Sequence, residues 1–425
     1  FIVAYYGPLS LTVVYTLAFF TTFLASVFAM FFNCINICNC LVSNNSYNIN
    51  TVSHKSIGLF YGIVVLIFGT VGLLESLLIR MELDSMSNLL YSNNNLGIYN
   101  YSVTIHGLVM IFFTVVPFNI GTLGNINTPL LNGSTDLNYP RINLLSLTIL
   151  MVSFIVGLLS ILSEYCNGVG WTFYTPLRSK NSSLGSVSGT LLLFVVITNS
   201  ISSTGSSINF LITYVLLKSK GLSLSRMNLL VVSIFYTVAL LTAVVPILLT
   251  GLLMILLDLH MNFIYFDSSY GGDSINYQHI FWIFGHPEVY IVLLPALGIT
   301  SEIIATNARK PIFGYRAMVA SILAIAFLST IVWGHHMFVT GMNPFLGSVF
   351  TFTTLLIAIP SAVKAFNYIA TLWKGNLQLN PAMLFSIGLV STFITGGLTG
   401  IILGDSALDI NVHDTYFVVA PIRVN

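Results

Sequence analysis

Long apolar runs separated by short polar segments dominate this chain. Asn-, Ser- and Gly-rich stretches such as NNSYNIN and YFDSSYGGDS, which are typical of turns and loops, divide the runs from one another. Ten runs have about the 20 residues that a helix needs to cross a bilayer, near residues 8–32, 57–80, 101–124, 142–163, 186–214, 229–257, 280–303, 315–338, 346–372 and 382–403. A further run begins near residue 411. The pattern predicts an all-α, polytopic transmembrane helix bundle with about ten complete spans and the start of another.

The composition agrees with a lipid environment and excludes a soluble domain. Of the 425 residues, 56% are hydrophobic and only 6% are charged, whereas soluble domains carry about 25% charged residues. The formal net charge of +1 gives no reason to expect a nucleic-acid partner. We therefore expect a multi-pass membrane protein.

The basic residues give an orientation. If successive spans alternate, nine Lys and Arg residues fall on one face and three on the other, and the basic face of a membrane protein is usually the inner one. The inner set comprises Lys55, Arg141, Lys218, Lys220, Arg226, Arg309, Lys310, Arg316 and Lys374, and the outer set comprises Arg80, Arg178 and Lys180.

Several ionisable residues lie inside the predicted spans. Each charge at that depth costs roughly 2.5–3.5 kcal/mol on insertion scales, so such residues are candidates for function. They are Glu75, His106, His286, Glu288, Tyr290, His335, His336 and Lys364.

Three histidines in this set form a pattern that suggests a metal site. His286 and Tyr290 are four residues apart and share one helix face, while His335 and His336 are adjacent on another helix. Together they can supply three imidazole nitrogens, which suit copper, zinc, iron or nickel, and three ligands with an open position are typical of catalysis. For a single histidine such as His106, a hydrogen-bonded core residue is the alternative.

Two further residues can carry protons. Glu288 has no basic partner in its span and points away from the face that His286 and Tyr290 share. Lys364 lies in the inner half of its span. The alternatives are a helix-packing hydrogen bond for Glu288 and a Lys364 side chain that reaches to the interface. A channel or transporter would use such residues but would leave the histidines unexplained.

Motifs along most of the chain, from about His54 to Ala420, resemble those of subunit 1 of the haem–copper oxidases, most closely the mitochondrial type. In chain order they are TIHGLVMIFFTVVPFNIGTLGN, YPRIN, GVGWTFYTPL, YQHIFW, HPEVYIVLLP, VWGHHMF, IPSAVKAFN and LDINVHDTYFVVA. The resemblance implies an oxidase core over residues 55–425, which stops short of the family's last helices. It leaves an extra transmembrane helix and linker over residues 1–54.

The resemblance also implies roles for the membrane histidines. His286, His335 and His336 would bind the copper (CuB) that pairs with haem a3, and His106 would be one axial ligand of the low-spin haem a. Tyr290, covalently joined to His286, and Glu288 would be the catalytic residues.

Other roles that the resemblance implies concern protons, magnesium and the surroundings of the haems. One proton pathway would use Asp136, Asn125, Asn143 and Glu288, and a second would use Lys364, Ser361 and Ser301. A magnesium ion would be held near His413 and Asp414. Arg80, Trp171 and Tyr174 would lie beside the haems.

The implied activity is the reduction of oxygen to water with electrons from cytochrome c, coupled to proton uptake and pumping, in the mitochondrial inner membrane. The implied partners are cytochrome c, the copper-bearing subunit 2, subunit 3 and the lipid membrane. A quinol oxidase subunit is the nearest alternative, and a non-catalytic fragment kept for assembly is another.

The sequence departs from the family at three kinds of position. Pro421 and Arg423 stand where the family has a His-aromatic-His triplet that ligates both haem irons, so we expect a separate polypeptide to supply those ligands. Glu302 replaces a common histidine near the second proton pathway. Glu75 adds a carboxylate to the first family-like helix.

Overall fold

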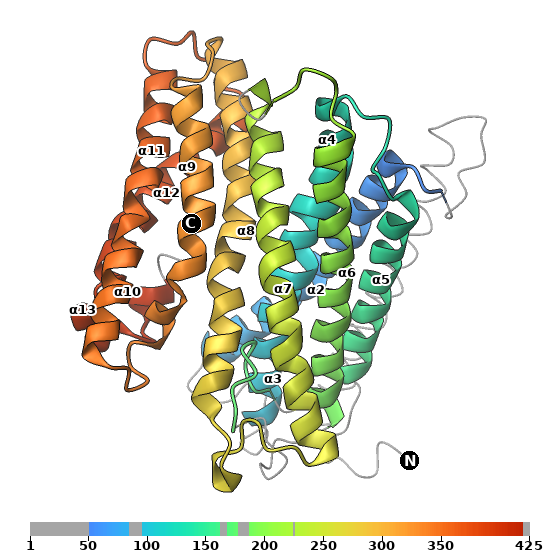
Figure 1. The fold of residues 1–425 in the computed structure, drawn as a ribbon, viewed down its shortest axis with the longest axis vertical. Coiled ribbons are helices and arrows are strands. Elements are labelled where there is room, and N and C mark those ends of the chain that lie inside the picture. The colour runs from blue at the N-terminus through green and yellow to red at the C-terminus, as the bar shows by residue number, and fades with distance from the viewer. Residues whose placement is uncertain (1–50, 85–95, 162–167, 177–186, 224–225, 420–425) are drawn as a thin grey trace.

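The structure is a computed structural model, and it describes residues 51–84, 96–161, 168–176, 187–223 and 226–419. Within those ranges the chain is helical and contains no β-strand. The long helices run side by side to form one bundle (Figure 1), which confirms the predicted all-α class. Residues 1–50 lie outside the described residues. They include the expected span near 8–32 and most of the expected extra segment 1–54.

The elements follow the predicted spans closely. Their bounds are α2 (His54–Asp84), α3 (Leu96–Leu108), η1 (Val109–Val115), η2 (Pro117–Gly124), α4 (Asn125–Asn132), α5 (Pro140–Ile161), α6 (Val187–Leu216), α7 (Leu229–Met261), η4 (Ser268–Tyr270), α8 (Ser274–Ala308), α9 (Tyr315–Leu328), η5 (Ser329–Ile331), η6 (Trp333–Met337), α10 (Pro344–Leu356), α11 (Ala358–Leu372), α12 (Pro381–Leu403) and α13 (Ser406–Val412). Among the described residues, eight helical segments are long and apolar enough to cross a membrane.

Two predicted spans differ from the observed helices. The run near 315–338 is a shorter apolar helix that ends at Ile331, because the backbone at Val332 leaves the helical region and a 3₁₀ turn, η6, follows. The run near residue 411 begins with the short helix α13, whose C-cap His413 has an extended backbone. A new helical stretch then covers residues 416–419.

Glycines on α2 allow the next helical segment to pack closely. A Cβ atom at Gly58, Gly62, Gly69 or Gly72 would lie within 3.3 Å of a side chain on that segment. The contact partners run backwards along the sequence, from Asn125 and Ile126 to Val109 and Met110, so the two segments are antiparallel. Small residues at helix interfaces are typical of membrane bundles, where close backbone approach supplies the packing energy.

The segment that packs on α2 is partly wound as a π-helix. η1 and η2 interrupt the α-helix on either side of Pro117, which has no backbone N–H to donate. π-helical turns are rare and are found mostly at functional sites. This local unwinding follows directly after His106.

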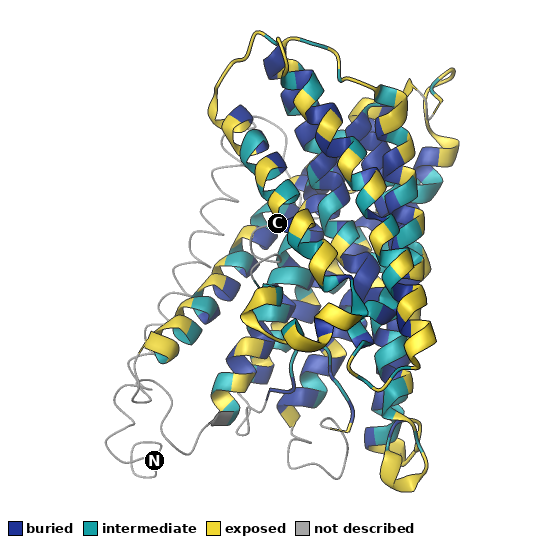
Figure 2. Ribbon diagram, turned by 90° about the vertical axis from the view of Figure 1, so that its left-hand side faces the viewer, coloured by how far each residue is buried: buried dark blue, intermediate teal, exposed yellow. Residues whose placement is uncertain are grey.

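The centre of the bundle is the pair α7 and α8 together with their neighbours. Ile234, Val238, Leu252, Ile291 and Leu294 are fully buried there. Buried residues line the interior of the bundle and exposed residues lie on its outside (Figure 2). The buried set includes many polar side chains, whereas many large apolar side chains are exposed. Such a distribution suits a protein that faces lipid, where only the interior can satisfy polar groups.

Hydrogen bonds between loops show which helix ends lie together. Ser219 donates its N–H to the Asn132 carbonyl at 3.1 Å, and Gln378 donates its N–H to the Asn307 carbonyl at 2.9 Å. The ends of α4 and α6 therefore lie together, as do the end of α8 and the segment before α12. Lys218 and Lys220 lie at the first of these joined ends, and Arg309, Lys310 and Lys374 lie near the second. The orientation that the charge count gives stays a prediction, and Arg178 and Lys180 lie outside the described residues.

The α7–α8 crossing generates a prediction. A Cβ at Gly298 would lie 2.1 Å from Ser233 Oγ and 3.0 Å from Leu230 Cα, so Gly298→Ala should lower the free energy of unfolding by about 1–3 kcal/mol. Thermal unfolding of the detergent-solubilised protein measures this. Gly157→Ala is the control, because a Cβ there meets Val195 at an ordinary 3.6 Å. Equal melting temperatures for the two variants would contradict the predicted overpacking.

Candidate metal centre and polar routes

Three histidines from two parts of the chain meet in the bundle. His286 lies midway along α8, and His335 and His336 lie on the 3₁₀ turn η6. One nitrogen of each ring lies within 4.8 Å of the others, and His286 Nδ1 is 3.3 Å from His336 Nε2. The predicted convergence of the three imidazoles is therefore present in the structure.

Neighbouring side chains orient the rings on η6. His335 Nδ1 lies 3.0 Å from Thr354 Oγ1 on α10, and that hydroxyl donates to the Phe350 carbonyl. The threonine must therefore accept from His335, which leaves His335 Nε2 with a free lone pair for a metal. His336 stacks on Trp282 with ring centroids 3.9 Å apart. Neighbouring groups that contact a histidine ring in this way orient it as a metal ligand.

Gly334 lets the turn that carries the two histidines approach α10. A Cβ at Gly334 would lie 2.2 Å from the Phe350 ring. Phe350 therefore packs against the backbone of η6, one residue before His335. A side chain at Gly334 would push the turn away from α10 and from the Thr354 hydroxyl.

Tyr290 lies beside the histidine cluster as its spacing predicted. The ring centroids of His286 and Tyr290 are 4.8 Å apart. His286 Nε2 is buried and has no hydrogen-bond partner among the described residues. The nitrogen that does not face His336 is thus left without a partner.

The donor set fits copper. Three imidazoles suit copper, zinc, iron or nickel, and among the described residues no carboxylate or cysteine completes a fourth position. A three-nitrogen site with an open position is typical of a catalytic metal.

His106 occupies a separate position on α3. Its Nδ1 lies 2.8 Å from the Gly72 carbonyl of α2, so Nδ1 donates and Nε2 keeps its lone pair. This arrangement fits an axial haem ligand, because the hydrogen bond fixes the tautomer and the direction of the ring.

One loop connects the surroundings of His106 with the histidine cluster. Trp171 lies against Gly107, where a Cβ would be 3.5 Å from it, and its ring meets Trp282 edge-on. Tyr174 accepts a hydrogen bond from Trp282 Nε1, and burial raises the pKa of this tyrosine. Arg80, by contrast, is exposed near the end of α2.

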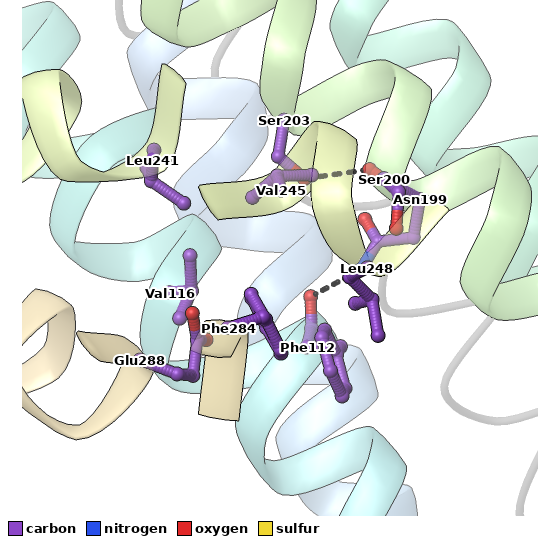
Figure 3. Close-up of a pocket in the computed structure, with 10 residues that line it drawn as sticks. All are labelled: Phe112, Val116, Asn199, Ser200, Ser203, Leu241, Val245, Leu248, Phe284 and Glu288. Atoms are coloured by element: carbon purple, nitrogen blue, oxygen red, sulfur yellow. Dashed lines mark hydrogen bonds between the residues drawn. The ribbon is translucent and has the colours of Figure 1, made fainter. Parts of the chain in front are cut away.

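Glu288 of α8 faces a small cavity that residues of α6 and α7 also line (Figure 3). It is 3% exposed, and its Oε2 has no hydrogen-bond partner among the described residues. The cavity is lined by Phe112, Val116, Asn199, Ser200, Ser203, Leu241, Val245, Leu248, Phe284 and Glu288. The polar lining residues come from α6, and the sequence analysis missed them, although NSISSTGSS is an unusually polar run for a membrane helix.

Residues of the first expected proton pathway lie nearer the inner end. Asn143 Nδ2 donates to Asn125 Oδ1 at 2.6 Å, and both side chains are fully buried. Asn132, which was not predicted, is also fully buried, and neither its Oδ1 nor its Nδ2 has a hydrogen-bond partner in the described part of the chain. Asp136 is half-buried in the loop after α4, and its Oδ1 accepts from the Leu137 N–H.

Lys364 is fully buried in α11, and its Nζ has no hydrogen-bond partner among the described residues. The alternative in which it reaches to the interface is therefore wrong. Ser301 Oγ lies 3.0 Å from the Tyr368 hydroxyl, one turn along α11 from Lys364. Tyr368 thus joins Ser301 to the Lys364 helix, whereas Ser361 lies on the same helix and is half-buried.

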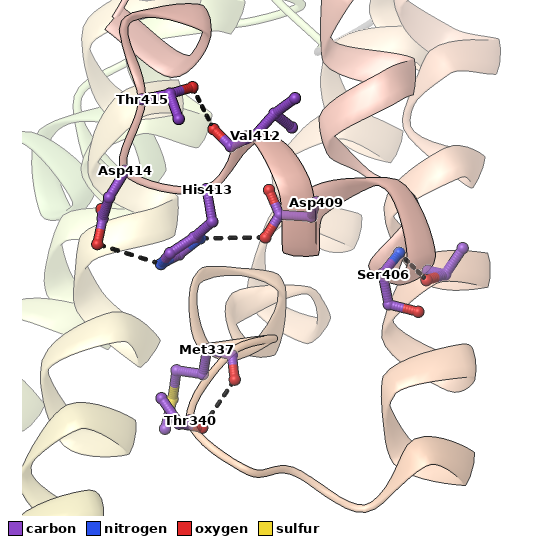
Figure 4. Close-up of polar contacts among 9 residues, drawn as sticks. Met337, Thr340, Ser406, Asp409, Val412, His413, Asp414 and Thr415 are labelled. Atoms are coloured by element: carbon purple, nitrogen blue, oxygen red, sulfur yellow. Dashed lines mark hydrogen bonds and ion pairs between the residues drawn. The ribbon is translucent and has the colours of Figure 1, made fainter.

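The expected magnesium residues form a cluster with Asp409 (Figure 4). His413 Nδ1 lies 3.1 Å from Asp409 Oδ2, and His413 Nε2 lies 3.5 Å from Asp414 Oδ2. Burial raises the pKa of Asp409, and His413 partly offsets that effect. The two carboxylates supply the oxygen ligands that magnesium prefers, but both His413 nitrogens are engaged.

Glu302 has a structural partner that accounts for its position. Its carboxylate accepts hydrogen bonds from the Asn228 side chain and the Leu229 N–H, at the N-terminus of α7. A carboxylate there stabilises the first helical turn. Pro421 and Arg423 lie outside the described residues.

Comparison with known proteins agrees with this geometry. Residues 56–422 match the family "Cytochrome C and Quinol oxidase polypeptide I". Curated relatives named cytochrome c oxidase subunit 1 are 41% identical in Plasmodium falciparum and 42% identical in Plasmodium berghei, each over 89% of this chain and 80% of the relative.

A solved structure has the same fold. A chain of a haem–copper terminal oxidase dimer superposes with a TM-score of 0.72 at 20% identity, covering 87% of this chain and 65% of that one. By the extent of the family match and the identity to its relatives, the chain belongs to the cytochrome c and quinol oxidase polypeptide I family.

Proposed function

We propose that this chain is the core catalytic subunit of a respiratory terminal oxidase in the mitochondrial inner membrane. It reduces oxygen to water with electrons from cytochrome c, and it couples this reaction to proton uptake and pumping. The observation that carries the proposal is the cluster of His286, His335 and His336, of which His286 is buried and the other two are half-buried, with Tyr290 beside it, inside a helix bundle of the oxidase family.

The histidines hold the cofactors. His286, His335 and His336 would hold copper, and His106 would bind the iron of haem a through Nε2. The copper and haem a3 together supply the electrons and the site at which oxygen is reduced. Tyr290 contributes a proton and an electron from its hydroxyl, held beside His286. Trp171 and Tyr174, in residues 168–176, and Arg80, near the end of α2, would lie beside the haems.

Glu288 is the proton carrier on the inner side of the copper site. Its free oxygen faces a cavity with Asn199, Ser200 and Ser203, where water can link the carboxyl to the route from Asp136 past Asn125 and Asn143. A buried carboxyl with an unpartnered oxygen can accept a proton and turn to release it. Glu288 can then deliver protons to the metal site while bulk water stays excluded from it.

Lys364 carries protons on a second route. Its ammonium has no partner among the described residues, and it lies one turn from the Tyr368–Ser301 pair. Ser301 and Ser361 lie on the same route. The charge of Lys364 is stabilised only when water or a negative group reaches it, so the residue is suited to transient protonation.

A separate polypeptide supplies the iron ligands that Pro421 and Arg423 cannot provide. It carries the His-aromatic-His sequence and packs with this chain, the copper-bearing subunit 2 and subunit 3. Residues 1–54 add a transmembrane helix and linker to the oxidase core. Asp409 and Asp414 would hold magnesium at the outer side, with His413 between them. The cluster in Figure 4 supports this role by gathering two carboxylates.

A quinol oxidase subunit is the second candidate function, because the matching family covers both electron donors. The names of the curated relatives favour cytochrome c. The donor is tested by supplying the purified complex with reduced cytochrome c or with a quinol.

The dithionite-reduced absorption spectrum of the purified complex, with and without carbon monoxide, tests the function. We expect a carbon monoxide-sensitive a-type haem, because a five-coordinate iron then lies beside the copper ligands. Mass spectrometry of the same sample should find His-aromatic-His on a polypeptide separate from this chain. If the complex contains this chain in stoichiometric amount but no haem, the proposed catalytic function is wrong, and the chain is a non-catalytic fragment kept for assembly.

The hydrogen bond from His335 to Thr354 predicts a change in copper affinity. Thr354→Val removes the acceptor, and losing a partner of this kind weakens metal binding about 10–100-fold. Copper content after dialysis against a graded chelator measures the effect. The matched control is Thr353→Val, because Thr353 donates to the Phe350 carbonyl. Equal copper retention in both variants would count against copper at this site.

Removing the carboxyl of Glu288 should slow proton delivery. Glu288→Gln keeps the shape but cannot carry the proton, and positioned proton transfer contributes about 10²–10⁴-fold to rates. Oxygen consumption by the purified complex should fall by about a hundredfold, and Glu288→Asp should restore part of the rate. Full activity in the glutamine variant would refute the assigned role.

A further inference from the structure

Glu75 is a buried carboxylate that the oxidase reaction described above does not use. It is 6% exposed, and it lies on the face of α2 that packs against α3. The Ser102 hydroxyl of α3 donates to one of its carboxyl oxygens. The other oxygen, Oε2, is buried without a hydrogen-bond partner among the described residues.

The packing of α2 places Glu75 next to His106. Gly58, Gly62, Gly69 and Gly72 line one interface of α2, which we call the glycine seam. Along this seam Gly69 packs against Thr114 and Gly72 packs against Met110, and Glu75 contacts Ser102. The Gly72 carbonyl accepts the hydrogen bond from His106. Glu75 and Ser102 are therefore the next layer of the same seam, one helical turn or about 5 Å along the axes.

The seam makes the carboxylate unusual. Gly58, Gly62, Gly69 and Gly72 hold the backbones close, and a small residue would continue that pattern. Glu75 instead brings an ionisable group into a tightly packed, water-poor interface, where charges are weakly screened. A hydrogen bond between helices needs only one oxygen, so Oε2 is left for another task.

Few other ionisable groups share this region. η1, η2 and α4 contribute none. The only ionisable residue of α5 is Arg141, at the start of that helix. Near the level of Glu75, the described ionisable side chains on α2 and α3 are Arg80, Glu82, Asp84, Tyr99, Tyr101 and His106. The hydroxyl of Tyr101 is bonded to Ser160 of α5, and the acidic and basic residues of α2 lie beyond Glu75, toward its end.

We propose that Glu75 binds a proton when the low-spin haem held by His106 is reduced, and releases it when that haem is oxidised. The inference rests on the proposed function, which assigns this haem to His106. Reduction of ferric to ferrous iron by one electron adds a negative charge beside the seam, which favours the protonated carboxyl. The electron comes from the one-electron donor of the oxidase, and the proton comes from water and binds at Oε2.

Redox titration of the low-spin haem in the purified complex, between about pH 6 and pH 9, tests the proposal. In the parent protein the midpoint potential should fall as pH rises, with a slope of at most the 59 mV that a tenfold change gives for one electron. Glu75→Gln should flatten that slope and raise the midpoint at high pH, because it removes the carboxylate that stabilises ferric iron.

The control variants separate this role from a structural one. Glu75→Gln keeps a partner for Ser102, so a purely structural Glu75 would leave the slope unchanged, and that result would overturn the proposal. Glu82→Gln removes a carboxylate from the same helix and should behave as the parent does. Absence of any low-spin haem in the parent complex would instead overturn the proposed function itself, and this inference with it.

If Glu75→Gln fails to assemble, infrared difference spectra of the parent protein decide the question. Reduction of the low-spin haem should produce a protonated carboxyl band that shifts in heavy water. Ser102→Ala should displace that band, because it removes the hydrogen bond to Glu75. A reduced-minus-oxidised spectrum without such a band would refute the proposal.

Discussion

Polar side chains held away from water must find partners inside the protein, and this constraint governs the whole bundle. Lipid cannot satisfy a polar group, so each one must bond to the protein or to trapped water. Most buried polar groups here do so: Asn143 bonds to Asn125, and many serines and threonines bond to carbonyls of the preceding helical turn. The groups left without partners in the described chain include Glu288 Oε2, Lys364 Nζ and His286 Nε2, to which we assign chemistry.

Breaks in helical regularity bring these groups together. The helix that begins with α9 ends at Ile331, and the 3₁₀ turn after it carries His335 and His336 to α8. Gly334 and Phe350 hold that turn against α10, where Thr354 orients one ring. A regular helix across this region would carry the two histidines along its own axis rather than toward His286. The local departure from the α-helix is therefore part of the metal site.

The position of His106 depends on a different feature, the glycine seam between α2 and the helical segment that follows it. Close backbone approach lets the Gly72 carbonyl orient His106, and the same closeness keeps water away. An ionisable group placed in that seam, as Glu75 is, responds strongly to a nearby change in charge. Two positions in one bundle thus combine a histidine with a buried acid: His286 and Glu288 on α8, and His106 on α3 with Glu75 on α2.

Hydropathy and spacing in the sequence determined the spans, their alternation and the ionisable residues at membrane depth. The four-residue interval between His286 and Tyr290 also predicted their contact, because helical geometry is local and regular. The end of a helix at Ile331, the burial of Lys364 and the partners Thr354, Tyr368, Asn132 and Asp409 were decided by the tertiary structure. These features depend on which helices are neighbours and how they are rotated. A nearly uniform apolar sequence specifies neither, because in lipid every face of such a helix is almost equally soluble.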